Sequence, residues 1–442
     1  MKCGFAKTVI NPPLGTPIVG YYSERLTKGV IDDLQAKAVA FESDGVKAVL
    51  IQVDLCLLTE ETCNEMREMV SEFCGMDANA VLISCNHTHT GPLTSKDFAS
   101  DKVADPNYMA FLKTSVRDVA AYAFQDLKPA SFSVAQTRAE GISFIRRFRM
   151  KDGSVRTNPD AQDPNIDHPL GEPNETLKLL KIVRDGGDDI YLINFGTHAD
   201  TVGGSYISAD YSGYACAALE GAIPGIQCVF VLAPQGDVNH FDVSKANKGR
   251  KNKAPGVTDA AAHAKYMGRV LAGSILKVCD STTPINSEGI QFGSAFVDVP
   301  SHQENDKLEE AIRINDLYEA GRGDELGYAG MQLTSIVAQA RRIIRLKDGP
   351  ATFAKKLSAL RVGDYVFAGF AGEPFTSIRN RIEEETPFEN TMVCALLNGS
   401  GGYFPSTQAY SEGGYEVLTS SFGPGTDELL IQGLINLLED LK

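Results

Sequence analysis

Apolar runs with the length of β-strands alternate with longer segments of helical periodicity along the whole chain. Neither an internal repeat nor a linker rich in serine and glycine interrupts this alternation. Because helices that connect strands cover the faces of a sheet, the pattern predicts one large α/β unit over residues 1–442. The length alone would allow about three domains of roughly 150 residues, but large α/β units often exceed that size.

The individual elements are predicted from the period of their apolar residues. The expected strands are residues 46–58, 80–84, 177–183, 190–195, 226–232, 364–370 and 392–397. The expected helices are residues 60–74, 107–127, 259–278, 304–318 and 328–344, and a last helix that is capped by Thr426 and ends near Leu441. The sequence Asp-Gly-Gly-Asp at 185–188 predicts a hairpin between two of the strands. Residues 152–176, which are rich in Pro, Asn and Asp, are expected to form a loop.

Several expected strands end in clusters of glycine, histidine, aspartate, asparagine or glutamate. His87 and His89 lie just after one strand, His198 after another and Glu373 after a third, and the segment 235–240 follows a fourth. The carboxyl ends of strands are where open α/β sheets bind ligands. These polar segments are therefore expected to converge on one pocket.

The histidines in these clusters suggest a metal site. His87 and His89 are separated by one residue, so an extended backbone would place both imidazoles on the same face. Together with a third histidine, such as His198, and a glutamate they form a ligand set that suits Zn²⁺. A pair of hydrogen-bonded core histidines is the alternative interpretation. His240 also follows a strand but lies deeper in its loop, and the remaining histidines are interpreted as structural: His168, His263 and His302.

Composition and missing motifs exclude several classes of protein. The chain has 57 acidic and 42 basic residues and a net charge of −15, which disfavours nucleic-acid binding. Its nine cysteines contain no C-x-x-C pair and indicate buried thiols in a reducing compartment. Without a signal peptide or an apolar run of about 18 residues, the expected location is cytoplasmic. The motifs of serine hydrolases, zincins, P-loop enzymes and nicotinamide-dependent enzymes are absent.

A series of short motifs extends from residue 4 to about residue 425. They are GFAKTVINP at 4–12, NHTHTGP at 86–92, ISADYSG at 207–213, QGDV at 235–238, GEPF at 372–375, GY at 402–403, YE at 415–416 and FGP at 422–424. In type and order these motifs resemble the catalytic domain of the neutral/alkaline, non-lysosomal ceramidase family. The resemblance implies an α/β fold with a mixed β-sheet and flanking helices, and hydrolysis of an N-acyl amide bond.

The resemblance also implies a role for individual residues. It implies that one Zn²⁺ per chain is bound by His87, His198, Glu373 and Tyr403. His89 would lie beside the metal and transfer a proton or orient the substrate, and Tyr415 and Arg146 would contact the substrate carbonyl. Residues 141–147 match the family only loosely, so Arg147 is an alternative to Arg146.

We expect the chain to depart from the family pattern in three ways: at one residue, in lacking a further domain and in lacking the export signal of secreted ceramidases. Asn239 stands where the family usually has a serine linked to catalysis, directly after the QGDV motif. Because an amide can hydrogen-bond but cannot form an acyl-enzyme, a serine nucleophile is excluded here, and Asn239 is predicted to position the substrate. The sequence also stops soon after residues 422–424, so we expect no β-sandwich domain of the kind found in secreted ceramidases. A soluble small amide is therefore as compatible with the chain as a sphingolipid.

These observations predict hydrolysis of an amide by zinc-activated water. Asp200 or Asp237 would orient a ligand histidine, and hydrogen bonding to loop backbone is an equal alternative for both. An ester or lactone hydrolase, or a metal-binding protein without activity, remains an alternative function, and a metallophosphatase is less compatible with the motif order. The expected partner is a small-molecule or lipid-like amide, with no nucleic acid and no membrane span, and the sequence does not indicate an oligomeric state.

Overall fold

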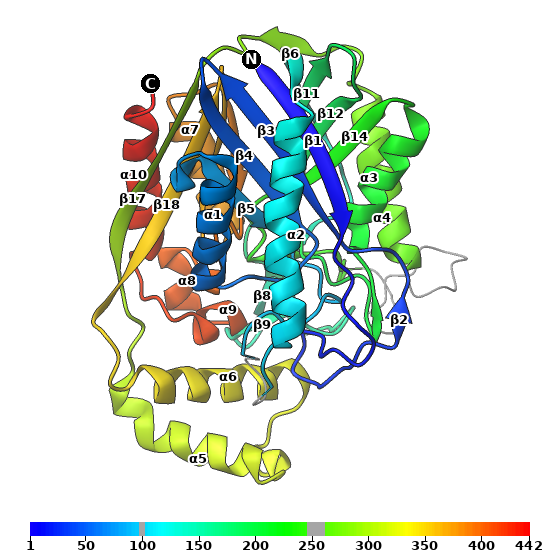
Figure 1. The fold of residues 1–442 in the computed structure, drawn as a ribbon. Coiled ribbons are helices and arrows are strands. Elements are labelled where there is room, and N and C mark those ends of the chain that lie inside the picture. Colours follow the sequence, from blue (N-terminus) through cyan, green and yellow to red (C-terminus); the bar gives the residue numbers. More distant parts are fainter. Residues whose placement is uncertain (97–101, 245–260) are drawn as a thin grey trace.

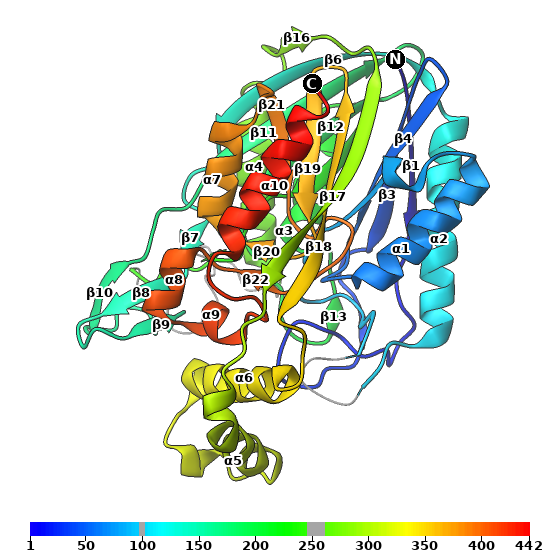
Figure 2. The same cartoon turned by 90° about the vertical axis from the view of Figure 1, so that its left-hand side faces the viewer.

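Two β-sheets pack face to face, and helices cover the outer face of each, so that the protein has four layers (Figures 1 and 2). The computed structural model describes residues 1–96, 102–244 and 261–442. The predicted class, α/β with a large mixed sheet and flanking helices, is confirmed. Within the described residues, no helix is both long enough and apolar enough to cross a bilayer.

The larger sheet has the strand order β14-β12-β11-β6-β1-β3-β4-β5, and β16 pairs with β6. Its strands are β1 (Lys2–Val9), β3 (Gln35–Ser43), β4 (Val46–Val53), β5 (Val81–Cys85), β6 (Lys128–Arg138), β11 (Thr176–Arg184), β12 (Asp189–Phe195), β14 (Ile226–Leu232) and β16 (Thr283–Ile285). The pairs β4–β5 and β12–β14 are parallel and the other pairs are antiparallel. The sheet is therefore mixed.

The smaller sheet has the order β17-β18-β19-β21. Its strands are β17 (Ile290–Pro300), β18 (Thr352–Val362), β19 (Tyr365–Phe370) and β21 (Asn390–Cys394). Its inner face packs on the larger sheet through a shared apolar core, to which Phe41, Leu82 and Leu192 contribute from one sheet and Leu360 and Phe367 from the other. The sequence did not reveal this second layer, because a strand buried on both faces shows little alternation.

Helices cover the outer faces of both sheets (Figure 2). Those on the larger sheet are α1 (Glu60–Cys74), α2 (Pro106–Gln125), α3 (Asp210–Ala222) and α4 (Ala262–Leu276), and those on the smaller sheet are α7 (Thr376–Glu385) and α10 (Thr426–Glu439). Between β17 and β18 the chain forms α5 (Leu308–Glu319) and α6 (Gly330–Leu346), which project from one end of the molecule (Figure 1).

Short elements form among the segments that link the long strands. The short strands are β2 (Gly29–Val30), β7 (Phe144–Ile145), β8 (Arg147–Met150), β9 (Val155–Thr157), β10 (Ile166–Pro169), β13 (Tyr206–Ile207), β15 (Val238–Asn239), β20 (Glu373–Pro374) and β22 (Tyr403–Phe404). The short helices are α8 (Thr407–Glu412) and α9 (Tyr415–Thr419), with the 3-10 turns Ala78–Ala80, Asn305–Lys307 and Gly323–Leu326. The pairs β20–β22 and β7–β15 matter most for function, because they carry candidate site residues.

The two edge strands of the larger sheet, β14 and β5, approach each other. The segment that follows β21 lies between them: Ala395 N donates to Leu232 O of β14 at 2.9 Å, and Asn398 N donates to Ile83 O of β5 at 2.7 Å. This connection joins the ends of the two sheets. It brings the carboxyl ends of β5, β12 and β14 together with the ends of β19 and β21.

Most predicted elements are present with small shifts. Helix α1 and strand β14 match their predicted ranges, and β11 and β12 form the predicted antiparallel hairpin. The prediction that Thr426 caps the last helix is wrong, because Gly425 (φ 89°) is the N-cap and Thr426 is already helical. The expected loop at 152–176 contains β9 and β10, which pair with β8. These strands have only three and four residues, which is too short to leave a clear periodicity in the sequence.

Candidate metal centre

Three of the predicted ligands converge in the interior. The carboxylate oxygen Oε2 of Glu373 lies 3.1 Å from Nε2 of His87 and 3.3 Å from Nε2 of His198. His87 follows β5, His198 follows β12 and Glu373 begins β20, and all three side chains are buried. One nitrogen of each histidine and one carboxylate oxygen therefore meet in a cluster that could hold a metal ion.

The other ring nitrogens of these two histidines face backbone carbonyls. His87 Nδ1 lies 2.8 Å from Cys56 O, and His198 Nδ1 lies 3.1 Å from both Gln235 O and Val238 O. A carbonyl oxygen only accepts hydrogen bonds, so the hydrogen-bond network assigns a ring hydrogen to Nδ1, and Nε2 is the nitrogen that faces Glu373 and would bind a cation there. This is the tautomer and orientation that a metal ligand requires.

His87 and His89 lie side by side, but not for the reason expected from an extended backbone. His87 has φ of 67°, in the left-handed region that is uncommon for residues other than glycine. The chain therefore turns at His87 instead of continuing as a strand. The turn leaves the Nε2 atoms of His87 and His89 3.2 Å apart, and Gly20 packs so closely on His89 that a Cβ atom there would lie 2.7 Å from its ring.

Strand β22 places Tyr403 beside Glu373. The two residues are partners in the parallel pair β20–β22, and the Tyr403 ring stacks on His198 with 6.3 Å between ring centroids. Gly372 permits this approach, since a Cβ atom there would lie 2.2 Å from the ring of Phe404. Burial and the Glu373 carboxylate raise the pKa of Tyr403. A cation bound at the cluster would oppose both effects.

Arg146, not Arg147, extends into the cluster. Its Nη1 lies 3.2 Å from His198 Nε2, and its Nε lies 2.7 Å from the buried carboxylate of Glu416. Arg147 points elsewhere, with Nη1 3.3 Å from Glu412. The alternation of side chains along β7 and β8 separates these two neighbours, and only the strand register determines which of them faces the histidines.

Tyr415 and Asn239 border the cluster at greater distance. The Tyr415 ring lies 5.8 Å from that of Tyr403, and its hydroxyl is 3.0 Å from the hydroxyl of Tyr22. Asn239 lies in β15, where its Nδ2 donates to Asn158 Oδ1. Tyr22 and Asn158 were not predicted from the sequence, because each contacts the site across a long separation along the chain and neither belongs to a recognised motif.

Solved ceramidase structures share this architecture. The crystal structure of neutral ceramidase from Pseudomonas aeruginosa matches 99% of this chain and 74% of its own, with a TM-score of 0.72 and 17% identity. A structure of a ceramidase complexed with C2 matches 100% of this chain and 75% of its own, with a TM-score of 0.70 and 14% identity.

The chain has the neutral-ceramidase fold. No family model matches its sequence, and the search of curated proteins gave no match. The comparisons therefore show a likeness of fold.

Within this ceramidase fold, the two candidate aspartates contact other residues than the two cluster histidines. Asp237 Oδ1 accepts hydrogen bonds from Thr376 N at 2.7 Å and from Thr376 Oγ1 at 2.8 Å. Asp200 Oδ1 lies 2.9 Å from His240 Nδ1. The expectation that one of these aspartates orients His87 or His198 is wrong, because backbone carbonyls already occupy both Nδ1 atoms.

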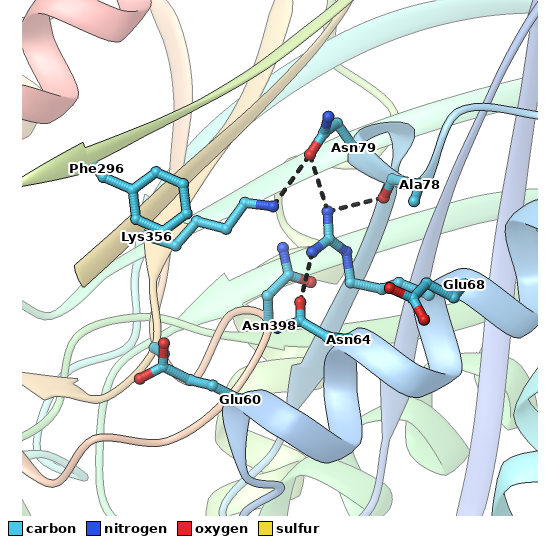
Figure 3. A pocket seen from close by; sticks show the side chains of 10 residues that line it. Glu60, Asn64, Glu68, Ala78, Asn79, Phe296, Lys356 and Asn398 are labelled. Carbon is cyan, nitrogen blue, oxygen red and sulfur yellow. Dashed lines mark hydrogen bonds between the residues drawn. The ribbon is translucent and has the colours of Figure 1, made fainter. Parts of the chain in front are cut away.

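Two cavities open in this ceramidase fold. One, of about 390 Å³, is lined by Tyr415 and Asn158 and so adjoins the candidate centre. The other, of about 290 Å³, lies near α1 and β18 (Figure 3). There Arg67 Nη2 and Lys356 Nζ both donate to Asn79 Oδ1, at 3.4 and 3.0 Å. These cations thus have partners within the fold. None of the cluster residues lines either cavity, and of the two only the first is lined by Tyr415 and Asn158.

Proposed function

We propose that this protein is a zinc-dependent hydrolase that cleaves a carboxylic amide. The observation that carries this proposal is the meeting of His87 Nε2, His198 Nε2 and Glu373 Oε2, with both Nδ1 atoms held by carbonyl oxygens. Nitrogen and carboxylate donors of this kind suit Zn²⁺, and Tyr403 would supply the fourth ligand. The ceramidase-like fold agrees with an amide as the substrate.

A zinc ion held there would lower the pKa of a bound water from about 15.7 to about 7 and so provide a hydroxide nucleophile. His89 is suited to move the proton. Burial and the neighbouring His87 lower its pKa well below the ordinary value, which keeps the ring neutral before the reaction and makes the protonated ring a strong proton donor. Its Nδ1 is buried without a hydrogen-bond partner among the described residues. His89 would pass the proton to the leaving amine.

Arg146 and Tyr415 are suited to stabilise the negative charge that develops on the carbonyl oxygen. The guanidinium of Arg146 is charged at any ordinary pH. Burial raises the pKa of Tyr415 well above its ordinary value, so its phenol keeps the proton that it would donate. Donors placed before the reaction at a developing oxyanion are usually the largest contribution to catalysis.

Asn239 would position the substrate and take no covalent part. Its Oδ1 accepts from Phe241 N at 2.9 Å, and its Nδ2 donates to Asn158, so the amide group is held in one orientation. One hydrogen of Nδ2 is left for a substrate oxygen. Attack by hydroxide needs no acyl-enzyme, and it does not by itself distinguish an amide from an ester.

Elemental analysis of the purified protein tests the metal first. We expect about one zinc per chain in the wild type and none in the double variant His87→Ala/Glu373→Ala, because two of the four ligands are removed. A matched control, His168→Ala/Glu309→Ala, changes an exposed histidine and an exposed glutamate and should keep the metal. Absence of metal from every protein after zinc is supplied would contradict the proposal.

A panel of amides and esters with the same acyl group then tests the bond. We expect the zinc-loaded wild type and the control variant to hydrolyse amides, and the double variant to lose this activity. Hydrolysis of the esters alone would replace the amide hydrolase with an esterase that uses the same centre. Zinc binding without hydrolysis of amides or esters would indicate a metal-binding protein without hydrolytic activity.

A further inference from the structure

The 390 Å³ cavity is lined by two residues that lie next to side chains of the proposed centre. Tyr415 lines it, and the Tyr415 ring is 5.8 Å from that of Tyr403 in the cluster. Asn158 lines it as well and accepts the hydrogen bond from Asn239. The cavity therefore touches two residues that adjoin the candidate centre, and its other walls are candidates for selecting the substrate.

The cavity is small, and its walls contain both apolar and polar side chains. Apolar side chains come from Val155, Pro159, Tyr328, Met331, Ile336 and Leu418. Polar side chains come from Arg156, Asn158, Asp160, Gln332 and Ser335. The volume is near the lower end of the range of about 300–1,000 Å³ for ligand sites. This combination fits a compact amide with a polar end better than a lipid with two long alkyl chains.

Arg156 lines the cavity and has few hydrogen-bond partners of its own in the described part of the chain. Its Nε is buried and has no hydrogen-bond partner among the described residues. Its ion pair with Asp163 has a nitrogen-oxygen distance of 3.8 Å, which is longer than a hydrogen bond. The Arg156 side chain as a whole lines the cavity and is 35% exposed. A guanidinium has five donors in a planar fork that matches a carboxylate, so its accessible nitrogens are suited to bind an anion in the cavity.

The backbone fixes Arg156 relative to the candidate centre. Strand β9 pairs with β8, and Arg156 is opposite Phe148 in that pair. The next residue, Thr157, accepts a hydrogen bond from Tyr415 N at 3.2 Å and donates to Glu416 at 2.8 Å. Arg156 thus lies on a paired strand that is attached directly to the segment that carries Tyr415. This attachment sets the spacing between an anionic group and a bond at the centre.

We propose that Arg156 binds a carboxylate of the substrate, so that the substrate is a small N-acyl compound with an anionic end, of the N-acyl amino acid type. The cavity would hold the anionic end against Arg156 and direct the amide toward Tyr415. This inference rests on the proposed amide hydrolase for the reaction, but the binding of the anion can be measured without it.

Isothermal titration of the zinc-loaded protein tests the binding. The ligands are N-butylsulfonylglycine, whose sulfonamide is not a carboxylic amide, and its neutral analogue with a hydroxymethyl group in place of the carboxylate. We expect the anion to bind about ten- to a hundredfold more tightly, since hydrogen bonds to charged groups are strong. The preference should vanish in Arg156→Gln and persist in Arg149→Gln, which changes an arginine on the neighbouring strand β8. Equal binding of both ligands, or of neither, would overturn the inference.

Hydrolysis of N-butanoylglycine and N-butanoylethanolamine separates this inference from the proposed function. We expect Arg156→Gln to raise KM about tenfold or more for the anionic amide, with kcat and the neutral amide little changed. If both amides are hydrolysed and Arg156→Gln has no effect, the inference is overturned and the proposed hydrolase function stands. Selective binding of the anionic sulfonamide without turnover of any amide would overturn the hydrolase and support the anion site.

Discussion

In each of the two cluster histidines, the two ring nitrogens face different kinds of partner. His87 and His198 direct Nδ1 to carbonyl oxygens and Nε2 to the carboxylate of Glu373. Because the carbonyls are parts of packed loops, they hold the ring orientation whether or not an ion is bound. At the residue scale, backbone carbonyls therefore orient the two histidine rings. A sequence motif made of side chains cannot reveal these carbonyls.

Replacing Arg146 tests the role of a single cation. We expect Arg146→Gln to lower kcat for amide hydrolysis by about 10²–10³-fold, as removal of one oxyanion donor does elsewhere, with zinc content unchanged. Arg147→Gln is the matched control, because Arg147 contacts Glu412, Gly413 and the second oxygen of Glu416 but neither cluster histidine. It should weaken the fold and keep kcat within a few-fold. Wild-type kcat in Arg146→Gln would contradict the assignment.

Asp54 gives a prediction about pH. It accepts hydrogen bonds from Asn86 Nδ2 and Gln35 N, and burial raises its pKa to about 6 from 3.8. The folded state therefore binds the proton more tightly, so this contribution to stability is complete below about pH 4 and is lost as the pH rises through about 6. We expect the free energy of urea unfolding, relative to Asp54→Asn, to fall by about 2 kcal/mol between about pH 4.5 and pH 8. A difference that stays constant or rises with pH would contradict this sign.

At the scale of elements, the loop after β14 packs directly on β20. Gly236 N donates to Pro374 O at 2.9 Å, and a Cβ atom at Gly236 would lie 2.4 Å from Glu373 O. The same loop supplies the carbonyl of Gln235 that meets His198. One close contact between two backbones therefore sets the separation of a carboxylate ligand and a histidine ligand.

Inserting a methyl group into this contact should disturb both ligands. We expect Gly236→Ala to lower zinc affinity by at least tenfold and to destabilise the protein by about 1–3 kcal/mol, the range for overpacking. The control is Gly221→Ala in α3, where a Cβ atom meets no atom within 4 Å. That helical substitution should be neutral or stabilise by about 0.5–1 kcal/mol. Zinc titration and urea unfolding of both variants measure these effects, and equal behaviour of the two variants would contradict the prediction.

At the scale of the whole molecule, the candidate ligands come from both sheets. His87 and His198 follow strands of the larger sheet, and Glu373 and Tyr403 follow strands of the smaller one. The two sheets are otherwise held together by apolar contacts between their inner faces and by hydrogen bonds from the segment after β21 to β14 and β5. A bound ion would therefore connect the two halves of the core.

Removal of the metal should for this reason lower the melting temperature. A ligand present at 1,000 times its dissociation constant stabilises the native state by about 4 kcal/mol. We expect a chelator to lower Tm by several degrees and added zinc to restore it, as calorimetry would record. The double variant His87→Ala/Glu373→Ala should show no response to either treatment. An unchanged Tm in the wild type after complete removal of zinc would show that the ion does not link the sheets.

Much of the fold could be predicted from local patterns. Helix α1 and strand β14 match the predicted ranges because their apolar periods are regular, and the Asp-Gly-Gly-Asp turn correctly indicated the hairpin of β11 and β12. His87 and His198 were also identified from their position after apolar strands. In these cases the residues that determine each element lie close together along the sequence.

The rest depended on contacts between distant segments. The sequence by itself determined the α/β class, the polar clusters at strand ends and the types of donor that a metal needs. Only the tertiary structure decided that two sheets stack, that Arg146 faces the cluster while Arg147 turns away, and that carbonyls of Cys56 and Gln235 orient the histidines. Periodicity and turn residues record local geometry, whereas register, stacking and carbonyl direction depend on which remote strands pair.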